Sequence, residues 1–290
     1  MIDAHHHIWR QADLPWLLGP EQPRIFGPYA PIKRDYSLEE YRSDLDGTGI
    51  MGSVYVQANW APNWALDEAR WVQAEADRTG WPMAIVGFAN MTTRHLRCYL
   101  KALSDVPGVR GIRHQFHWHE NPLYRFAAHP DLCRDEAVRE NMKLLADFGF
   151  SFDLQVFADQ MPGAVGLAKA CPEVTFVLQH AGMLEDRRKP NRAKWLAGMQ
   201  ALAECPNVVC KLSGLGTFLH KNDAAHIADQ VSVALNLFGA DRCLFGSNYP
   251  IEKLWTSYHA LLSAHVKAVP KQHRKAVFSE TAARVYRLKF

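Results

Sequence analysis

Three histidines from two distant segments are the residues best suited to chemistry in this chain. One residue separates His5 from His7 near the start, and His180 ends an apolar segment much later. In an extended strand alternate side chains share a face, so His5 and His7 would point one way and His6 the other. Neutral imidazole is a common zinc ligand, so a convergent trio would suit one metal ion. The first-strand pair alone is equally typical of simple packing, and a lone histidine such as His180 is more often structural than a ligand.

A polar residue at the end of another apolar segment is the second feature of this kind. Asn248 follows residues 243–247, with Gly246 before it and Pro250 after it, and Glu252 is close by. A capped turn would also explain this pattern. Together with the histidines, however, it predicts a reaction centre where several strands end. The catalytic candidates are His180, Asn248 and Glu252.

The segments that would position these residues alternate between two types. Short apolar, β-branched runs alternate with longer amphipathic ones, which indicates βα units and a parallel sheet. We expect strands at 2–7, 53–57, 84–90, 108–114, 152–156, 175–180, 208–213 and 243–248. We expect helices at 64–79, 135–148, 159–170, 194–204 and 223–238, and a last one at 273–288 that closes the ring. The prediction is α/β: one (β/α)8 TIM barrel, a single domain over residues 1–290.

Two long irregular segments interrupt this alternation. Residues 11–39 carry five prolines after the first strand, and residues 115–130 follow the fourth. Long loops in compact domains are usually functional. Barrel enzymes do their chemistry at the carboxyl ends of the strands, so we expect these loops to form walls of a substrate pocket.

Composition limits the partners. The chain has 33 basic and 30 acidic residues, a balance that does not favour nucleic acid or an anionic membrane surface. Six cysteines without a CxxC pair, and a start that does not read as a secretory leader, predict free thiols in the cytoplasm. The expected partner is a small-molecule substrate, and a homo-oligomer stays open.

Five ordered motifs resemble one known family. They lie at 3–9, 109–114, 178–182, 206–214 and 245–250, and the match runs on to 281–286. The chain resembles the amidohydrolase-2 branch of the amidohydrolase superfamily, which includes sugar-acid lactonases and the pyrone-dicarboxylate lactonase. The resemblance covers essentially the whole chain. It implies hydrolysis of a lactone, with a divalent metal in some relatives and none required in others.

The resemblance also assigns residues. His5 and His7 match the first-strand pair and His180 the sixth-strand histidine, so these three are the predicted ligands of one zinc or manganese ion. Asn248 stands where the family usually has an aspartate that takes a proton from the attacking water. An amide cannot do this, and general-base catalysis is typically worth about 10²–10⁴ in rate.

Three accounts of the missing aspartate stay open. His180 or Glu252 acts as the base; or a metal lowers the pKa of its water and Asn248 only orients the hydroxide; or the chemistry has changed or disappeared. Binuclear members of the superfamily bridge two metals with a modified lysine on strand four, and many zinc-binding members have a histidine on strand five. This chain has neither residue in those segments, so the resemblance does not imply a binuclear centre. A mononuclear site and a metal-free site both remain.

Substrate contacts are expected from five further residues. Arginine can bind a carboxylate through two hydrogen bonds, which suits Arg113. Only one of Arg113 and its neighbour His114 should face inward. Lys211 lies in the seventh-strand motif, and Trp60 and Trp118 would make the pocket mouth aromatic.

The leading hypothesis is a hydrolase that opens a lactone of a sugar acid or other carboxylic acid. A metal-dependent decarboxylase or hydratase acting on an aromatic carboxylic acid is the first alternative. A non-catalytic barrel is the second.

Overall fold

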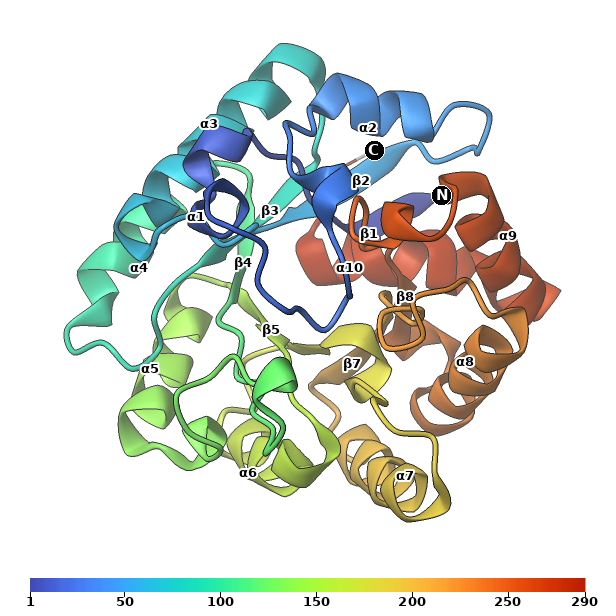
Figure 1. Cartoon of the computed structure of the whole chain (residues 1–290). Helices are drawn as coiled ribbons and strands as arrows, with labels where there is room; N and C mark the ends of the chain where they lie inside the picture. The colour runs from blue at the N-terminus through green and yellow to red at the C-terminus, as the bar shows by residue number, and fades with distance from the viewer. Residues whose placement is uncertain (290) are drawn as a thin grey trace.

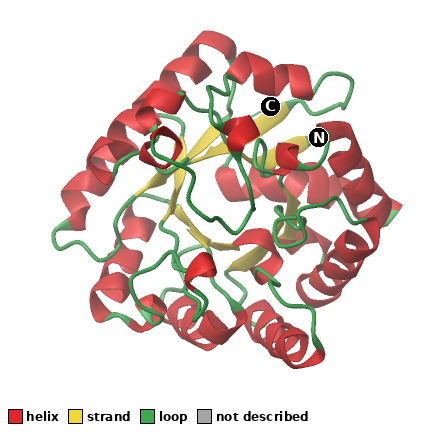
Figure 2. Cartoon of the chain, in the orientation of Figure 1, coloured by secondary structure: helices red, strands yellow, loops and turns green. Residues whose placement is uncertain are grey.

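Eight parallel strands lie at the centre of the molecule in the computed structural model, which describes residues 1–289. Figure 2 shows them inside a ring of helices. Each strand pairs with the next; they are β1 (Ile2–His6), β2 (Gly52–Val56), β3 (Ala84–Phe88), β4 (Val109–Arg113), β5 (Ser151–Leu154), β6 (Phe176–Leu178), β7 (Val208–Leu212) and β8 (Cys243–Phe245). The His7 amide donates to the Tyr249 carbonyl, and the Asn248 amide to the His5 carbonyl, both at 2.7 Å. These bonds join β1 to the segment after β8, and the predicted TIM barrel is confirmed.

One helix follows each strand and covers the outside of the barrel (Figure 1). The helices are α2 (Leu38–Asp44), α3 (Ala65–Thr79), α4 (Leu96–Ser104), α5 (Glu136–Asp147), α6 (Met161–Ala170), α7 (Lys189–Ala203), α8 (Ala224–Phe238) and α9 (Tyr258–Ala268). Four of them begin where a short polar side chain accepts a hydrogen bond from a first-turn N–H. These caps are Ser37, Asp135, Asp223 and Ser257. They set where the loop after the preceding strand ends.

Apolar side chains fill the barrel interior at the end where the strands begin. Ile2 and Ala84, the first residues of β1 and β3, belong to one buried cluster with Val285 and Tyr286 of α10 (Thr281–Tyr286). This short helix therefore plugs the barrel at its amino end. The opposite end stays available for polar residues.

The last helix differs from its prediction. Residues 273–288 were expected to close the outer ring, but α9, which was not predicted, does so. The final segment instead contains a π-helical turn (Ala276–Glu280) and α10. Its apolar residues pack into the bottom of the barrel, where Val285 and Tyr286 are buried against the strands. Helix α4 was also not predicted.

Every strand ends one to three residues earlier than predicted, and the difference bears most on the site at β6 and β8. Strand β6 stops at Leu178 and β8 at Phe245, before His180 and Asn248. The backbone of both residues is left-handed, with φ values of 53° and 59°. This conformation cannot continue a strand. Both side chains therefore sit on turns just beyond the sheet.

The long segment after β1 is only partly irregular. It contains the short helix α1 (Pro15–Leu18) and 3₁₀ turns at Gln11–Asp13 and Ala30–Ile32, and α2 begins inside its predicted range. The segment after β4 contains one 3₁₀ turn, Pro122–Tyr124. Among the described residues, no helix has both the length and the apolarity needed to cross a membrane.

Candidate active site

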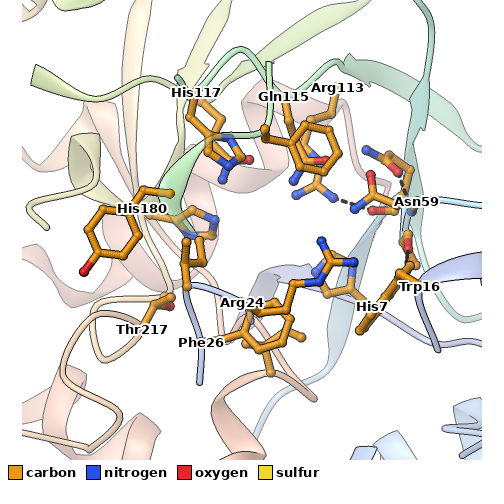
Figure 3. Close-up of a pocket in the computed structure, with 18 of the residues that line it drawn as sticks. His7, Trp16, Arg24, Phe26, Asn59, Arg113, Gln115, His117, His180 and Thr217 are labelled. Carbon is orange, nitrogen blue, oxygen red and sulfur yellow. Dashed lines mark hydrogen bonds between the residues drawn. The ribbon is translucent and has the colours of Figure 1, made fainter. Parts of the chain in front are cut away.

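A cavity of about 710 Å³ opens at the carboxyl ends of the strands (Figure 3). Residues that follow all eight strands contribute to its wall. The long β1 segment supplies Trp16 and Arg24, and the β4 segment supplies His117. The cavity is within the size range of small-molecule sites. Of the predicted residues, His7, His180 and Asn248 line it, whereas His5 is fully buried and does not.

A register shift in β1 orients its three histidines. The shift lies between Asp3 and His6 in the pairing with β2, and it lets Ala4 and His5 both face the barrel interior. The His5 ring centre is 5.1 Å from that of His7 and 5.0 Å from that of His180. His6 faces outward, stacks on Tyr41 of α2 and contacts the Ser53 hydroxyl at 3.0 Å. His5 and His7 thus share a side and His6 takes the other, as the alternation predicts.

The His7 tautomer follows from its partner. Its Nδ1 lies 2.6 Å from the Val56 carbonyl oxygen, which can only accept, so Nδ1 carries the proton. The Nε2 lone pair of His7 is therefore available in the cavity. Burial and the nearby Arg113 guanidinium hold the pKa of His7 well below 6.5, so the ring is neutral.

His180 is held in a similar way on its left-handed turn. Its Nδ1 is 3.1 Å from the Ser213 carbonyl oxygen and 3.0 Å from the Ser213 hydroxyl. With the Nδ1 proton donated to the carbonyl, Nε2 is an acceptor. Gly214 makes this close approach possible, because a Cβ there would lie 2.6 Å from the His180 Nδ1. Burial, followed by Arg113, lowers the pKa of His180 to about 3.

Asn248 lines the cavity, and Glu252 lies behind it. Glu252 is buried and accepts hydrogen bonds from the Trp255 indole at 3.0 Å and the Thr217 hydroxyl at 3.3 Å. The Asn248 side chain also stabilises this carboxyl group, although burial outweighs all three contacts and raises the pKa of Glu252 to about 8. Glu252 is thus largely protonated at neutral pH and reaches the cavity only through Asn248 and Thr217.

The raised pKa of Glu252 makes the free energy of unfolding depend on pH. Between pH 4.5, the ordinary pKa, and about 8, the folded protein keeps the Glu252 proton and the unfolded chain releases it. The free energy of unfolding should therefore fall as the pH rises through this window. Buried Glu68, whose pKa is raised to about 7, adds to the slope up to about pH 8, so the contribution of Glu252 is the difference in slope between the parent and Glu252→Gln. We expect Glu252→Gln to flatten the slope there in urea unfolding, whereas exposed Glu173→Gln should not. An unchanged slope in Glu252→Gln would contradict this.

Arg113 and His114 both line the cavity, although strict alternation allows only one of them. Arg113 is 3% exposed and donates to the Gln57 carbonyl, while its Nε has no partner. Its pKa is lowered by burial to about 10, so it stays charged at neutral pH. His114 follows the last strand residue, where the chain leaves the pleat, and its Nδ1 accepts from the Met91 amide at 3.2 Å.

The structure places Lys211 elsewhere. It faces the barrel interior beneath the histidines, is fully buried, and pairs with Asp153 at 2.7 Å. The same Asp153 carboxylate accepts hydrogen bonds from Gln179 at 2.8 Å and Tyr286 at 3.1 Å. Lys211 does not line the cavity, so its ammonium serves the barrel interior rather than a substrate.

The two predicted tryptophans, Trp60 and Trp118, differ in whether they line the cavity. Trp60 lines the cavity and is 8% exposed, with an unpartnered indole N–H. Trp118 does not line it, because its ring packs under the Arg125 guanidinium, 4.8 Å from the ring centre. Its position in the β4 loop predicts a place in the pocket mouth, but packing decides which way such a ring turns, so this prediction is wrong.

Several lining residues were not predicted. Arg24 comes from the β1 loop, and Gln57, Gln155 and Thr217 come from strand ends or the β7 loop. A polar residue immediately after an apolar strand, as at Gln57 and Gln155, was a usable signal. No such sequence signal marks Arg24 or Thr217, because the folding of loops brings these residues to the cavity.

The described residues do not form a clear site for the predicted zinc or manganese ion. Within residues 1–289, no three His, Cys, Asp or Glu side chains are arranged to hold a metal ion. His5, His7 and His180 offer neutral nitrogens, but no described carboxylate lines the cavity to balance a divalent charge. The Arg113 guanidinium, which lowers the pKa of His7 and His180, repels a cation there. The chemistry considered below therefore relies on the protein's own side chains.

Comparisons with known proteins agree with this architecture. The family model described as amidohydrolase matches residues 2–288. An L-fucono-1,5-lactonase of Burkholderia multivorans is 30% identical over 305 residues, covering 99% of this chain and 96% of that protein. A crystal structure of an amidohydrolase from Burkholderia multivorans with bound zinc is similar with a TM-score of 0.81 at 26% identity, over 99% of each chain. A 5-carboxyvanillate decarboxylase from Sphingomonas paucimobilis, at 13% identity and a TM-score of 0.68 over 100% of this chain and 99% of that one, shares the fold alone.

Proposed function

The chain belongs to the amidohydrolase family, and on that premise we propose that it hydrolyses a lactone, the cyclic ester of a sugar acid or another carboxylic acid. The observation that carries the proposal is the convergence of His7, His180 and Asn248 on one cavity beside the buried Arg113. Neutral imidazoles that present an acceptor nitrogen next to a fixed positive charge suit the attack of water on a carbonyl.

In the proposed reaction, water binds between His180 and Asn248. The His180 Nε2 accepts one water proton, and the Asn248 amide orients the oxygen. That oxygen adds to the lactone carbonyl carbon, the ring C–O bond breaks, and the imidazole returns the proton to the departing ring oxygen, which yields a hydroxy acid. A His180 pKa of about 3 keeps the ring unprotonated before the attack and makes the transient imidazolium a strong proton donor. The charge of Arg113 stabilises negative charge on the substrate.

The alternatives receive less support. A metal-dependent decarboxylase or hydratase needs a firmly held metal, and within residues 1–289 no three His, Cys, Asp or Glu side chains are arranged to hold one. A non-catalytic barrel is the simplest reading of the aspartate replacement, but His180 can supply the base that Asn248 cannot.

The direct test is an assay of purified protein on a panel of sugar-acid and aromatic-acid lactones, with and without added zinc or manganese. The proposal expects turnover of at least one lactone without added metal. Elemental analysis of the same preparation distinguishes the alternatives, because a stoichiometric metal with decarboxylation of an aromatic acid would overturn the proposal.

Restoring an acid at position 248 tests the role of the amide. Asn248→Asp places a second carboxyl group beside buried Glu252, and two such neighbours share a proton rather than both ionise. We expect kcat/KM to fall by about 10-fold, measured from pH 6 to 9, because the amide no longer orients the water. An inactive parent with an active Asn248→Asp variant would instead identify a barrel that has lost its catalyst.

A further inference from the structure

The charged residues that line the cavity carry one sign. They are Arg24, Arg113 and Arg125, and within residues 1–289 no Asp, Glu or Lys side chain lines it. The lining histidines add no negative charge and are neutral, because burial lowers their pKa, to about 4 for His114 and about 3 for His117. The cavity is therefore positive at neutral pH, and a neutral ligand would leave that charge uncompensated.

Two of the three guanidinium groups are available to a ligand. Arg125 donates to the carbonyls of His119 at 3.1 Å and Glu120 at 2.9 Å and packs on Trp118. Arg113 and Arg24 each have a buried Nε without a hydrogen-bond partner, and no described carboxylate lies within 4.0 Å of either. In Figure 3 both point into the space between His180 and Asn59.

The acids whose charges act most strongly on the pKa of Arg113 are Asp153 and Glu68. Asp153 pairs with Lys211, and the Glu68 Oε1 accepts hydrogen bonds from the Tyr55 hydroxyl at 2.7 Å and the Ala58 amide, while its Oε2 has no partner. Neither carboxyl group forms an ion pair with Arg113. Neither lines the cavity. No ion pair beneath the cavity neutralises Arg113, so its positive charge is available to a ligand.

Uncharged hydrogen-bond donors in the cavity wall also favour a ligand with acceptor oxygens. The Gln57 Oε1 accepts from the Asn59 amide at 2.7 Å, which fixes its Nε2 as a donor, and this Nε2 is buried without a partner. The Trp60 indole N–H, a donor only, is also unpartnered. A buried donor without an acceptor costs about 1–3 kcal/mol, so this wall is suited to a ligand rich in acceptor oxygens.

The β1 loop holds Arg24 in place from two sides. The Gly27 amide donates to the Arg24 carbonyl at 2.9 Å and closes a turn, and Gly27 has a φ of 75° that favours glycine. From the β7 loop, His220 contacts the Ile25 carbonyl at 3.0 Å, with its ring against Gly27. These contacts fix the backbone around Arg24, which lines the cavity.

We propose that Arg24 and Arg113 together bind a carboxylate of the substrate, so that the protein acts on lactones that carry a free carboxylate rather than on neutral lactones. This inference rests on the proposed lactone hydrolysis and names its substrate class. Arg24 is the specificity-determining residue, and Arg113 holds the same group next to the histidines.

Kinetics on matched substrates test this. A carboxylated δ-lactone and its methyl ester differ in charge and by one methyl group, and the parent should prefer the acid by at least about 10-fold in kcat/KM. Arg24→Gln keeps a donor but removes the charge, and should lower the acid-to-ester ratio by about 10- to 100-fold. Arg34→Gln removes a charge from the same loop outside the cavity and should leave the ratio unchanged. Equal use of acid and ester by the parent, or an unchanged ratio in Arg24→Gln, would overturn the inference.

Binding without turnover separates this inference from the proposed function. Glutarate, a simple dicarboxylate, should bind the parent in isothermal titration calorimetry more tightly than dimethyl glutarate and should bind Arg24→Gln at least about 10-fold more weakly. If no lactone is hydrolysed but this pattern holds, the anion site stands and the proposed reaction fails. If lactones are hydrolysed and glutarate binds parent and Arg24→Gln equally, the reaction stands and the anion site fails.

Discussion

Replacing His180 with asparagine is expected to lower kcat/KM for lactone hydrolysis by about 100-fold or more, with the fold intact. General-base catalysis typically raises the rate by a factor of about 10²–10⁴. Among the residues that line the cavity, His180 alone combines an available acceptor nitrogen with a contact to Ser213. Asparagine is the sharper substitution because it tolerates a left-handed backbone better than alanine does. The loss of rate therefore reports the imidazole and not strain in the turn. Steady-state kinetics measure it, and thermal unfolding confirms the fold.

A histidine outside the cavity provides the matched control. His259 is exposed on α9, and His259→Ala should leave both kcat/KM and stability unchanged. Gly214→Ala adds an independent perturbation, because the new Cβ displaces the His180 ring without removing it. Turnover in His180→Asn equal to that of the parent would remove His180 from the mechanism and leave the catalytic base unidentified.

Replacing Lys211 with methionine is expected to destabilise the protein by about 3–5 kcal/mol. Both charges of the Lys211–Asp153 pair are fully buried, so removal of the ammonium leaves an uncompensated carboxylate in the barrel interior. The Gln179 and Tyr286 donors remain but cannot replace a full charge. Urea unfolding at neutral pH measures the change.

Removing both charges should cost less than removing one. We expect Lys211→Met with Asp153→Leu to recover much of the lost stability, because no buried charge remains. An exposed pair gives the scale: Arg97→Ala breaks the bridge to Asp147 and should cost at most about 1 kcal/mol. A cost of that size for Lys211→Met would mean that water reaches the pair.

Much of the fold follows from local patterns. β-branched apolar runs of four to eight residues, separated by amphipathic segments, leave few alternatives to a parallel barrel. The convergence of His5, His7 and His180 follows as well, because strands of such a barrel end at one face. Neither conclusion needs a contact between particular side chains. The last helix was predicted wrongly because burial in the barrel decides its place. The ends of β6 and β8 were predicted wrongly because left-handed turns end these strands.

The sequence by itself determined the barrel, the face that carries the site, and the replacement of an expected aspartate by Asn248. Only the tertiary structure decided that Lys211 pairs with Asp153, that Glu252 lies behind Asn248, and that a loop brings Arg24 over the cavity. The reason is physical. Periodicity reports which face of an element is buried, whereas the partner of a buried charge and the path of a loop depend on contacts between residues far apart in the chain.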